Sequence, residues 1–428
     1  MRRRLILAAA AVAVAIVAAL WLFWPQPTQT QPEVASAQTQ MAWPLRGLLF
    51  GPSLDDPSPN PPADSSSSIV IDVCGAGKTK VTSLHDLPAP LIDPLRDARA
   101  LKRAVSELAA SSAPGDRAIA FHYEATMASR AAAGDDGGRA SACFTDDNCR
   151  ASAFQSIDQA AAPYYQQLAE LAGQTGDPLA MSLAFRACRS PEVARTGACT
   201  GITAARWAEL EPDNGVAWIL AANEAASRGD EAARNDAMAR AATAQRMDHH
   251  AEDLLRPIAT ASLRDANRLD QMAAFMATMG VYSGAPLLDY AEIGRYCLGK
   301  EAMDPSRKAQ CAQIAEQLVG KDTTQSGTSY GMRIGARAGW TVERLAALRD
   351  EIDAMNFMSI DERFRPETVY SCESLDAITQ RASDMLHFGE AGALRRKIAR
   401  SGRSVAELAR EYHEYQRRQA QAETTARQ

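Results

Sequence analysis

The chain has 428 residues, a formal net charge of −6 and a hydrophobic content of 46%. That length suits two or three ordinary domains or one extended helical array, and the apolar content permits a real core. The acidic balance gives no reason to expect a nucleic-acid partner. Alanine-rich segments with few β-branched residues favour close-packed helices over sheets.

Residues 1–24 are predicted to form a membrane anchor. Arg2, Arg3 and Arg4 precede an uncharged run over residues 5–24, which at about 1.5 Å per residue spans the roughly 30 Å hydrocarbon core of a bilayer. Arginines before the run place its start in the cytoplasm. We therefore expect a single pass through a bacterial inner membrane, with the bulk of the chain in the periplasm. The alternative is a signal peptide cleaved near Ala37, which also exports the chain.

Residues 25–66 contain nine prolines and are predicted to be a linker without a core of its own. A strand is predicted over Ser68–Val73, at the start of a helical body spanning 67–388. A basic C-terminal helix is expected over 389–428.

The helical body shows repeated start signals for short helices. Asp177 and Asp304 are each followed by proline, and Thr341 and Ser404 precede helical apolar patterns, as is typical of N-caps. Another helix is expected over Leu254–Met279. Consecutive hairpins of about 30–40 residues are typical of helical arrays. The predicted fold is all-α, an α-solenoid-like stack of helical hairpins with a short N-terminal strand segment and one transmembrane helix.

The most informative stretch is Arg206–Asp230, which reads as a helix end, a turn and a second helix. It has Pro212 where one repeat would end, Trp218 near the next helix start, Ala222 in mid-helix and Gly229 before a second helix. This pattern resembles the junction of two tetratricopeptide repeats.

The unit beginning at Tyr164 resembles the related Sel1-like repeats, so the similarity covers Tyr164–Ala241, within a core of about 151–245. The resemblance implies that large side chains fill spaces opposite small ones in the neighbouring hairpin. It also implies a concave surface for a protein or peptide partner. The residues assigned to this packing are Trp207, Leu210, Pro212, Trp218, Ala222 and Gly229.

Eight cysteines in an exported chain predict disulfides. Eight cysteines allow many connectivities, but three pairs of neighbouring cysteines bracket short loops. The two cysteines that remain would join the first segment to the last. The suggested pairs are Cys143 with Cys149, Cys188 with Cys199, Cys297 with Cys311, and Cys74 with Cys372. Without a CxxC motif or a histidine at ligand spacing, we expect no metal site.

Three motifs suggest chemistry that their context does not favour. Residues 327–331 match GxSxG, with Ser329 as nucleophile, His387 or His413 downstream and Asp361 between. The polar segment before this motif lacks the strand of a serine-hydrolase elbow. Residues 75–79 are half a P-loop without its first glycine. We therefore expect neither a nucleotide nor another cofactor.

His249 and His250 precede Glu252 and Asp253. Neighbouring histidines point to different faces of a helix, so we interpret this segment as a solvated loop rather than a metal site. The tail over 391–428 has nine Lys/Arg and four Glu. Its basic residues suit either anionic lipid or an acidic protein, but the interleaved glutamates favour a solvated helix face.

The leading hypothesis is a membrane-anchored, periplasm-facing scaffold that binds a protein. The alternative is a cell-envelope hydrolase that uses Ser329 and a distal histidine.

Overall fold

The computed structural model describes residues 69–81, 86–133, 147–190, 193–194, 196–285, 290–360 and 369–427. Within these ranges the chain is mostly helical, as predicted, and it also contains one small antiparallel sheet. The expected membrane span over residues 5–24 and the linker over 25–66 lie outside the described residues. No helix within the described ranges is long and apolar enough to cross a bilayer.

The sheet is a hairpin of β1 (Ile69–Val73) and β2 (Gly77–Val81), in which Val70 pairs with Lys80. β1 confirms the predicted strand, whereas β2 was not predicted. Gly75 lies in the turn with φ +85°, and a Cβ there would meet the Leu269 backbone nitrogen at 2.6 Å. The half P-loop therefore forms a turn and a strand, without the following helix that a phosphate cradle requires.

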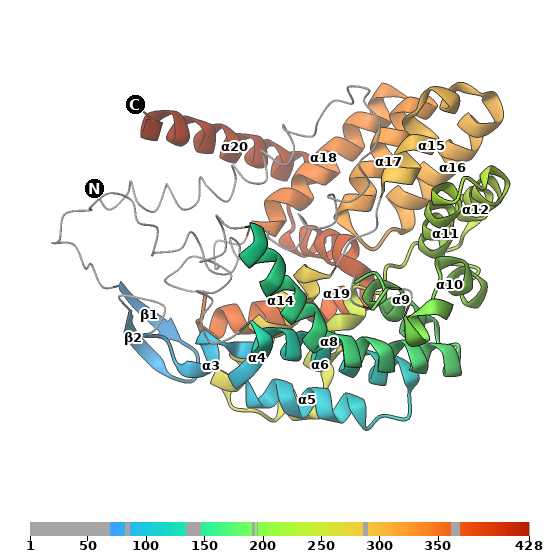
Figure 1. Ribbon diagram of the computed structural model, residues 1–428. Helices are drawn as coiled ribbons and strands as arrows, with labels where there is room; N and C mark the ends of the chain where they lie inside the picture. Colours follow the sequence, from blue (N-terminus) through green and yellow to red (C-terminus); the bar gives the residue numbers. More distant parts are fainter. Residues whose placement is uncertain are drawn as a thin grey trace.

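The helices follow an arc from α5 and α6 through α10–α12 to α15–α18, with α14 and α19 between its two arms (Figure 1). The first set comprises α3 (Ala89–Ile92), α4 (Pro94–Asp97), α5 (Arg99–Ala109), α6 (Pro114–Ala132), α8 (Asp147–Thr175), α9 (Pro178–Ala187) and the 3-10 helix η2 (Gly197–Gly201). The central set comprises α10 (Ala204–Leu210), α11 (Gly215–Ser227), α12 (Glu231–Thr243), η3 (Glu252–Ala259), α13 (Ala261–Arg264) and α14 (Arg268–Gly284). The last set comprises α15 (Ala291–Leu298), η4 (Lys300–Met303), α16 (Pro305–Lys321), α17 (Gln325–Ala338), α18 (Val342–Ser359), α19 (Cys372–Ser401) and α20 (Val405–Arg427).

The predicted N-caps are confirmed. A side-chain oxygen of Asp177 accepts a hydrogen bond from the Ala180 nitrogen at 2.8 Å, and Asp304 accepts from the Ser306 nitrogen at 3.0 Å. Thr341 and Ser404 likewise accept from backbone nitrogens three residues later. These caps satisfy donors that would otherwise lack partners at the first turn.

Two predicted helices differ from the structure. The segment Leu254–Met279 is divided among η3, α13 and α14, because Pro257 lies inside the 3-10 turn and Asn267 caps a new helix. The expected helix over 389–428 is two segments. Gly389 interrupts α19 with φ 71° and ψ 172°, and α20 begins after a second break at Gly402.

The stretch Arg206–Asp230 has the predicted helix, turn and second helix. Trp207 is fully buried in α10, and the indole nitrogen of Trp218 donates to the Pro212 carbonyl at 2.9 Å. Ala222 is also fully buried, and Gly229 ends α11 with φ +72°. Residues 215–222 of α11 are buried without a break, so its neighbours enclose this helix.

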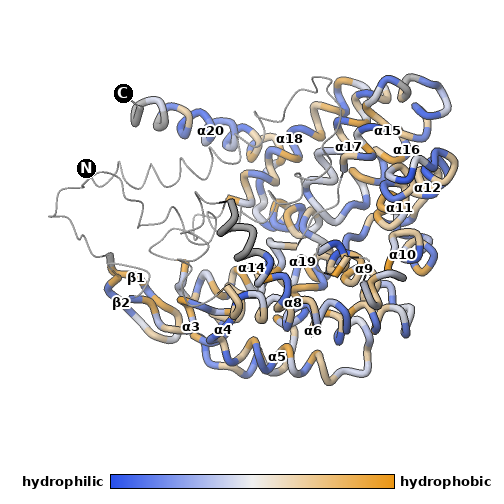
Figure 2. Tube along the Cα trace, viewed as in Figure 1, coloured by the Kyte–Doolittle hydropathy of each residue, from blue (hydrophilic) through white to orange (hydrophobic). Residues whose placement is uncertain are grey.

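Two hydrophobic clusters form the interior. The larger one runs from β1 to α19 and includes Ala393 in the second half of that helix. The smaller one joins α18, the second half of α19 and α20 through Met355, Leu394 and Leu408, and Met332 of α17 packs against it. We call α18, the second half of α19 and α20 the C-terminal block. Hydrophobic and hydrophilic residues are interspersed along the helices (Figure 2).

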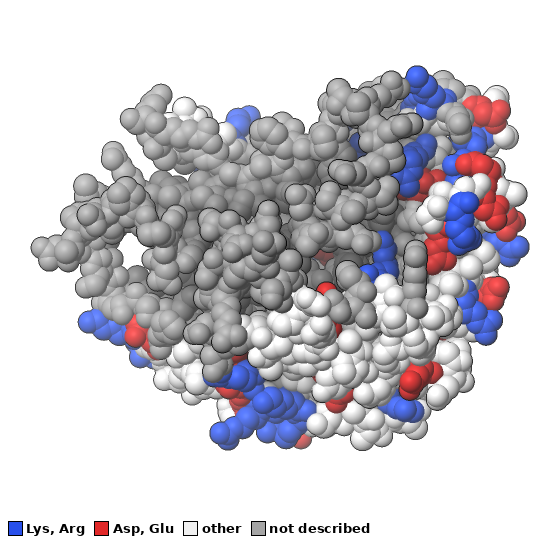
Figure 3. Space-filling model, in the orientation of Figure 1, with Lys and Arg blue, Asp and Glu red and all other residues white. Residues whose placement is uncertain are grey.

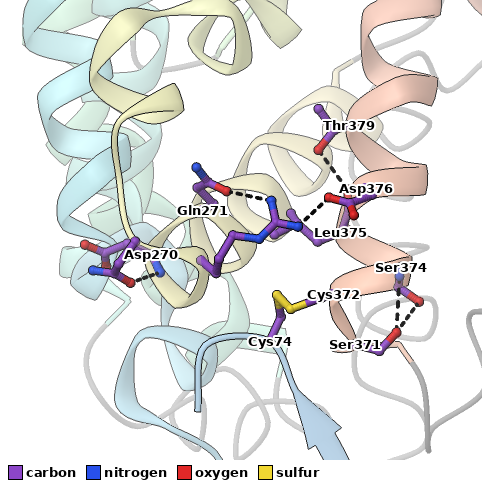
Figure 4. Close-up of a disulfide and its surroundings, with 11 residues drawn as sticks. Cys74, Asp270, Gln271, Ser371, Cys372, Ser374, Leu375, Asp376 and Thr379 are labelled. Atoms are coloured by element: carbon purple, nitrogen blue, oxygen red, sulfur yellow. Dashed lines mark hydrogen bonds and ion pairs between the residues drawn. A yellow bond between two sulfur atoms is a disulfide. The ribbon is translucent and has the colours of Figure 1, made fainter. Parts of the chain in front are cut away.

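Three of the predicted cysteine pairs are disulfides in the structure: Cys74–Cys372, Cys188–Cys199 and Cys297–Cys311. The first joins the hairpin to the start of α19, where Ser371 caps the helix by accepting from the Ser374 nitrogen at 3.1 Å (Figure 4). The Cys143–Cys149 pair falls outside the described residues and side chains. The Cys74–Cys372 disulfide thus links segments that are 298 residues apart in the sequence.

Candidate functional site

A buried polar junction forms where three segments distant in sequence meet. The Thr323 nitrogen donates to the Met247 carbonyl at 3.2 Å, and the Ala391 nitrogen donates to the Thr323 carbonyl at 2.9 Å. These bonds place an α12–η3 loop, an α16–α17 turn and the kink of α19 together. We define the polar junction as residues 246–253, 322–325 and 389–391, together with Glu211.

Glu211 is the acceptor at the centre of the junction. It is 2% exposed, yet its carboxylate accepts from the Trp207 indole at 2.7 Å, the Asn214 amide at 2.9 Å and the His250 ring at 3.0 Å. Arg246 forms an ion pair with the same carboxylate. Burial alone would raise the pKa of Glu211, but these bonds, with His250 foremost, lower it below its usual value. A buried carboxylate is tolerated here because it is fully paired.

His250 lies between two carboxylates. One ring nitrogen faces Glu211, and the other faces Asp253 at 2.9 Å. Its backbone has φ 54°, and its nitrogen donates to the Asp248 carboxylate at 2.8 Å, which supports this sparsely populated conformation. Burial alone would lower the pKa of His250, but Asp253 and Glu211 raise it to about 10. The imidazole is therefore protonated at neutral pH and links two segments as a cation.

His249 points to a different partner. Its Nε2 lies 3.2 Å from both oxygens of Asp322. Asp322 also accepts from the nitrogen and hydroxyl of Thr324, each at 2.7 Å. The Thr324 hydroxyl in turn accepts from the Gly327 nitrogen and caps α17. One buried carboxylate thus orders the start of α17 and binds it to the central loop.

Glu252 is a further buried carboxyl of the junction. It is 6% exposed, and its carboxylate accepts from the Glu390 nitrogen at 3.3 Å. Burial raises the pKa of Glu252 to about 7. At neutral pH this carboxyl is therefore divided between its neutral and charged forms.

The prediction of a solvated loop at His249 and His250 is wrong. The two residues are 1% and 7% exposed. Neither lies on an amphipathic helix, and their partners Glu211 and Asp322 come from other parts of the chain. Among the described residues, no group of three His, Cys, Asp or Glu side chains could hold a metal ion. The polar groups of the junction form ion pairs and hydrogen bonds between distant segments of the chain.

The residues predicted for a hydrolase do not adopt the geometry of a serine-hydrolase elbow. Ser329 lies within α17, and its hydroxyl bonds to the Gln325 carbonyl of the same helix at 3.3 Å. The His387 ring bonds to the Ser383 carbonyl at 2.7 Å, and His413 pairs with Asp353 at 3.2 Å. Asp361 lies outside the described residues. The strained strand-to-helix turn that exposes a serine nucleophile is not formed at Ser329.

Several basic residues of the tail stabilise the C-terminal block. Arg395 pairs with Glu351 at 2.6 Å, and the Lys397 ammonium donates to the Met358 carbonyl at 2.6 Å. Arg396 stacks over the Phe388 ring, with 4.1 Å from the guanidinium carbon to the ring centroid. Arg400 and Arg403 form ion pairs with Asp384 and Glu411. These contacts agree with a helix face on which acidic residues are interleaved with basic ones, rather than with a uniformly basic surface.

A surface hollow of about 540 Å³ lies beside α12. It lies between α12, α15 and the start of α16, and the Tyr296 hydroxyl donates to Gln310 at 2.6 Å. The next residues, Cys297 and Cys311, form a disulfide. Arg307 lies over the Tyr296 ring at 4.5 Å. The lining residues are Asn235, Tyr296, Asp304, Ser306, Arg307 and Gln310.

The surface around α10–α12 and α15–α16 carries basic and acidic side chains side by side (Figure 3).

Comparisons with protein-family models, curated proteins and solved structures find no match to this chain.

Proposed function

We propose that this chain is an exported scaffold protein that binds a protein or peptide partner. Residues 5–24 anchor it in a bacterial inner membrane, and its body faces the periplasm. The three disulfides support this location, because such bonds persist in oxidising compartments and are rare in the cytosol.

We further propose that the body is an α-solenoid-like array related to the tetratricopeptide and Sel1-like repeats. The packing of α10, α11 and α12 supports this assignment, since Trp207 of α10 and the small residue Ala222 of α11 are both fully buried. Because α11 is enclosed, the binding surface of this array is the outer side of α12.

The hollow beside α12 is the observation that carries the binding proposal. Its polar lining offers donors and acceptors to a peptide backbone, and Tyr296 supplies an aromatic edge. The Cys297–Cys311 disulfide fixes the two elements that contribute Tyr296 and Gln310. A site held in shape before binding loses less conformational freedom when a partner is bound.

Crosslinking in intact membranes tests the hollow. Arg307→Glu should reduce recovery of the crosslinked partner about tenfold, equivalent to about 1.4 kcal/mol of binding free energy, because it reverses a charge in the lining. Arg206→Glu is the matched control, since Arg206 is an exposed arginine of α10, 54% accessible and paired with Glu209. Equal recovery from both variants would reject the hollow as the binding position.

Ser329→Ala and His387→Ala are expected to leave folding and partner recovery unchanged. Their polar atoms bond only to carbonyls of their own helices in the contacts described above. Circular dichroism and the membrane crosslinking assay provide the measurements. Equal losses of envelope function in both variants, with folding intact, would instead favour a hydrolase.

A further inference from the structure

A compact group of basic side chains lies over α5, on the side of the molecule that carries the β-hairpin (Figure 3). Arg99, Lys102 and Arg103 are all exposed. Within the described part of the chain, none of the three forms an ion pair or a side-chain hydrogen bond. The surface around α10–α12, in contrast, carries charges of both signs side by side. The three cations of α5 are therefore open to an anionic partner.

The stability of α5 does not account for these cations. They stand at i, i+3 and i+4, where like charges on one helix face repel each other. The first turn of α5 has no acidic residue, and Ala98 provides no side-chain cap. Cations near a helix N-terminus also oppose the helix macrodipole. Both effects disfavour the helix, so the group adds nothing favourable to the fold.

The acidic residues close to α5 in the sequence are committed to other groups. Asp93 is 8% exposed and forms an ion pair with α6. Asp97, just before α5, pairs with Arg96 at 3.1 Å. Glu107, near the end of α5, accepts from the Ser262 nitrogen at 3.0 Å and from the Ser262 hydroxyl at 2.7 Å. The surface that α5 presents to solvent is therefore positive.

The β-hairpin extends this surface. Lys78 and Lys80 of β2 are exposed, and Asp72, opposite Lys78 in the register, is the exposed acid of the hairpin. A Cβ at Gly75 would lie 2.6 Å from the Leu269 nitrogen of α14, and α14 contacts α3, α4 and α5. The hairpin and α5 are thus held together through α14. We define the basic surface as Lys78, Lys80, Arg99, Lys102 and Arg103.

The place of the basic surface along the chain indicates its partner. Residues 25–68 join the proposed membrane anchor to β1, and a flexible linker of that length spans about 35–40 Å on average. A surface tethered so close to a bilayer meets it at a high effective concentration, so weak contacts suffice. Each basic side chain near an anionic membrane strengthens binding about fivefold. An anionic bilayer therefore matches the basic surface in both charge and position.

We propose that the basic surface rests on the anionic phospholipid headgroups of the membrane that holds the chain. Arginine binds a phosphate through two parallel hydrogen bonds, and lysine binds it as a point charge. The hairpin and α12 lie at opposite sides of the body (Figure 1), so this contact turns the hollow beside α12 away from the bilayer and toward a partner. The inference rests on the proposed anchor at residues 5–24.

Lysine acylation of the full chain tests the contact. The chain is reconstituted into vesicles of phosphatidylcholine alone, or of phosphatidylcholine and phosphatidylglycerol in equal parts, and a membrane-impermeant reagent modifies the outward-facing lysines. An anionic surface raises the local proton concentration about threefold, and the reagent attacks only neutral amines. Acylation of Lys78, Lys80 and Lys102 should therefore be slower by about threefold or more on the anionic vesicles. Lys300, exposed in η4, should react equally on both, and about 1 M salt should abolish the difference.

Flotation of the same vesicles separates this proposal from the anchor. A chain that floats with both vesicle types at high salt, but whose lysines react equally on both at low salt, keeps the anchor and rejects the basic surface. A chain that floats only with anionic vesicles at low salt lacks the anchor and supports the basic surface. A chain that floats with neither contradicts both. Slowing of the three lysines by soluble poly-glutamate, but not by anionic vesicles, would assign the surface to an acidic protein and overturn the lipid contact.

Charge reversal in α5 tests the same contact through a variant. Arg99→Glu combined with Arg103→Glu should bring the ratio of Lys102 acylation rates on the two vesicle types close to one. Arg228→Glu is the control, since Arg228 is exposed at the end of α11, and it should keep the wild-type ratio. A double variant that folds and keeps that ratio would show that these arginines do not contact lipid.

Thermal unfolding distinguishes a lipid contact from a structural role. Arg99→Glu places an acid in the first turn of α5, where the helix macrodipole favours it, so the unfolding temperature should stay equal or rise. A lower unfolding temperature would instead give Arg99 a role within the fold and contradict the proposal.

Discussion

Replacing Trp207 with alanine should lower the free energy of unfolding by about 5 kcal/mol. Removing a fully buried tryptophan costs about 3–5 kcal/mol through lost burial and the cavity that remains. Here the change also removes the indole donor from Glu211, a buried carboxylate bonded at 2.7 Å. A buried acceptor that loses a partner adds roughly 1–3 kcal/mol. Urea unfolding monitored by circular dichroism, with disulfides intact, measures the effect.

Two variants separate the cavity from the hydrogen bond. Trp207→Phe keeps most of the ring volume but loses the donor, so it should cost about 1–3 kcal/mol. Trp218→Ala should cost about 3–5 kcal/mol, because that residue is 8% exposed and its indole bonds to a backbone carbonyl rather than to a buried charge. A smaller loss for Trp207→Ala than for Trp218→Ala would contradict the central role assigned to Glu211.

Removal of the Cys74–Cys372 disulfide should destabilise the chain more than removal of the Cys188–Cys199 disulfide. The first closes a sequence separation of 298 residues and the second a separation of 11. The chain-entropy treatment gives about 5–6 kcal/mol and about 3 kcal/mol for loops of these lengths, as upper estimates. Paired alanine replacements, compared by urea unfolding, measure the difference.

Thiol labelling accompanies that measurement. Each double variant should show no labelled thiols among the remaining described cysteines after denaturation without reductant. Equal stability of the two double variants would mean that the reduced chain stays compact near the hairpin, so that the long loop is already closed. Free thiols in the unmodified chain would reject the pairing itself.

Local sequence signals predicted much of the fold, because their physical causes are local. Asp177 and Asp304 satisfy the first turns of their own helices, and Pro212 follows directly after the end of α10. The hairpin strand β2 was missed because its residues, with two lysines and a glycine, lack the alternation of a half-buried strand. The break at Pro257 was missed because the apolar spacing continues across it.

The polar junction was not predictable from local pattern. Charged residues and histidines are rarely buried, so neighbouring histidines followed by two acids look like a surface loop. The two histidines can be buried because each pairs with a distant carboxylate. His250 pairs with Glu211, 39 residues earlier, and His249 pairs with Asp322, 73 residues later. Such pairings depend on tertiary arrangement, and a single sequence carries no signal for them. The positive φ of His250 has the same origin, since its support comes from the folded loop.

The position of the Cys74–Cys372 disulfide has a consequence for how the chain matures. A chain that emerges from its N-terminus exposes Cys74 first, and six other cysteines follow before Cys372 appears. Pairing in order of appearance would join Cys74 to an early neighbour. Native closure therefore requires either that the other cysteines pair among themselves first or that a premature bond is exchanged. The first route needs only an oxidant, whereas the second also needs a thiolate that attacks the premature disulfide.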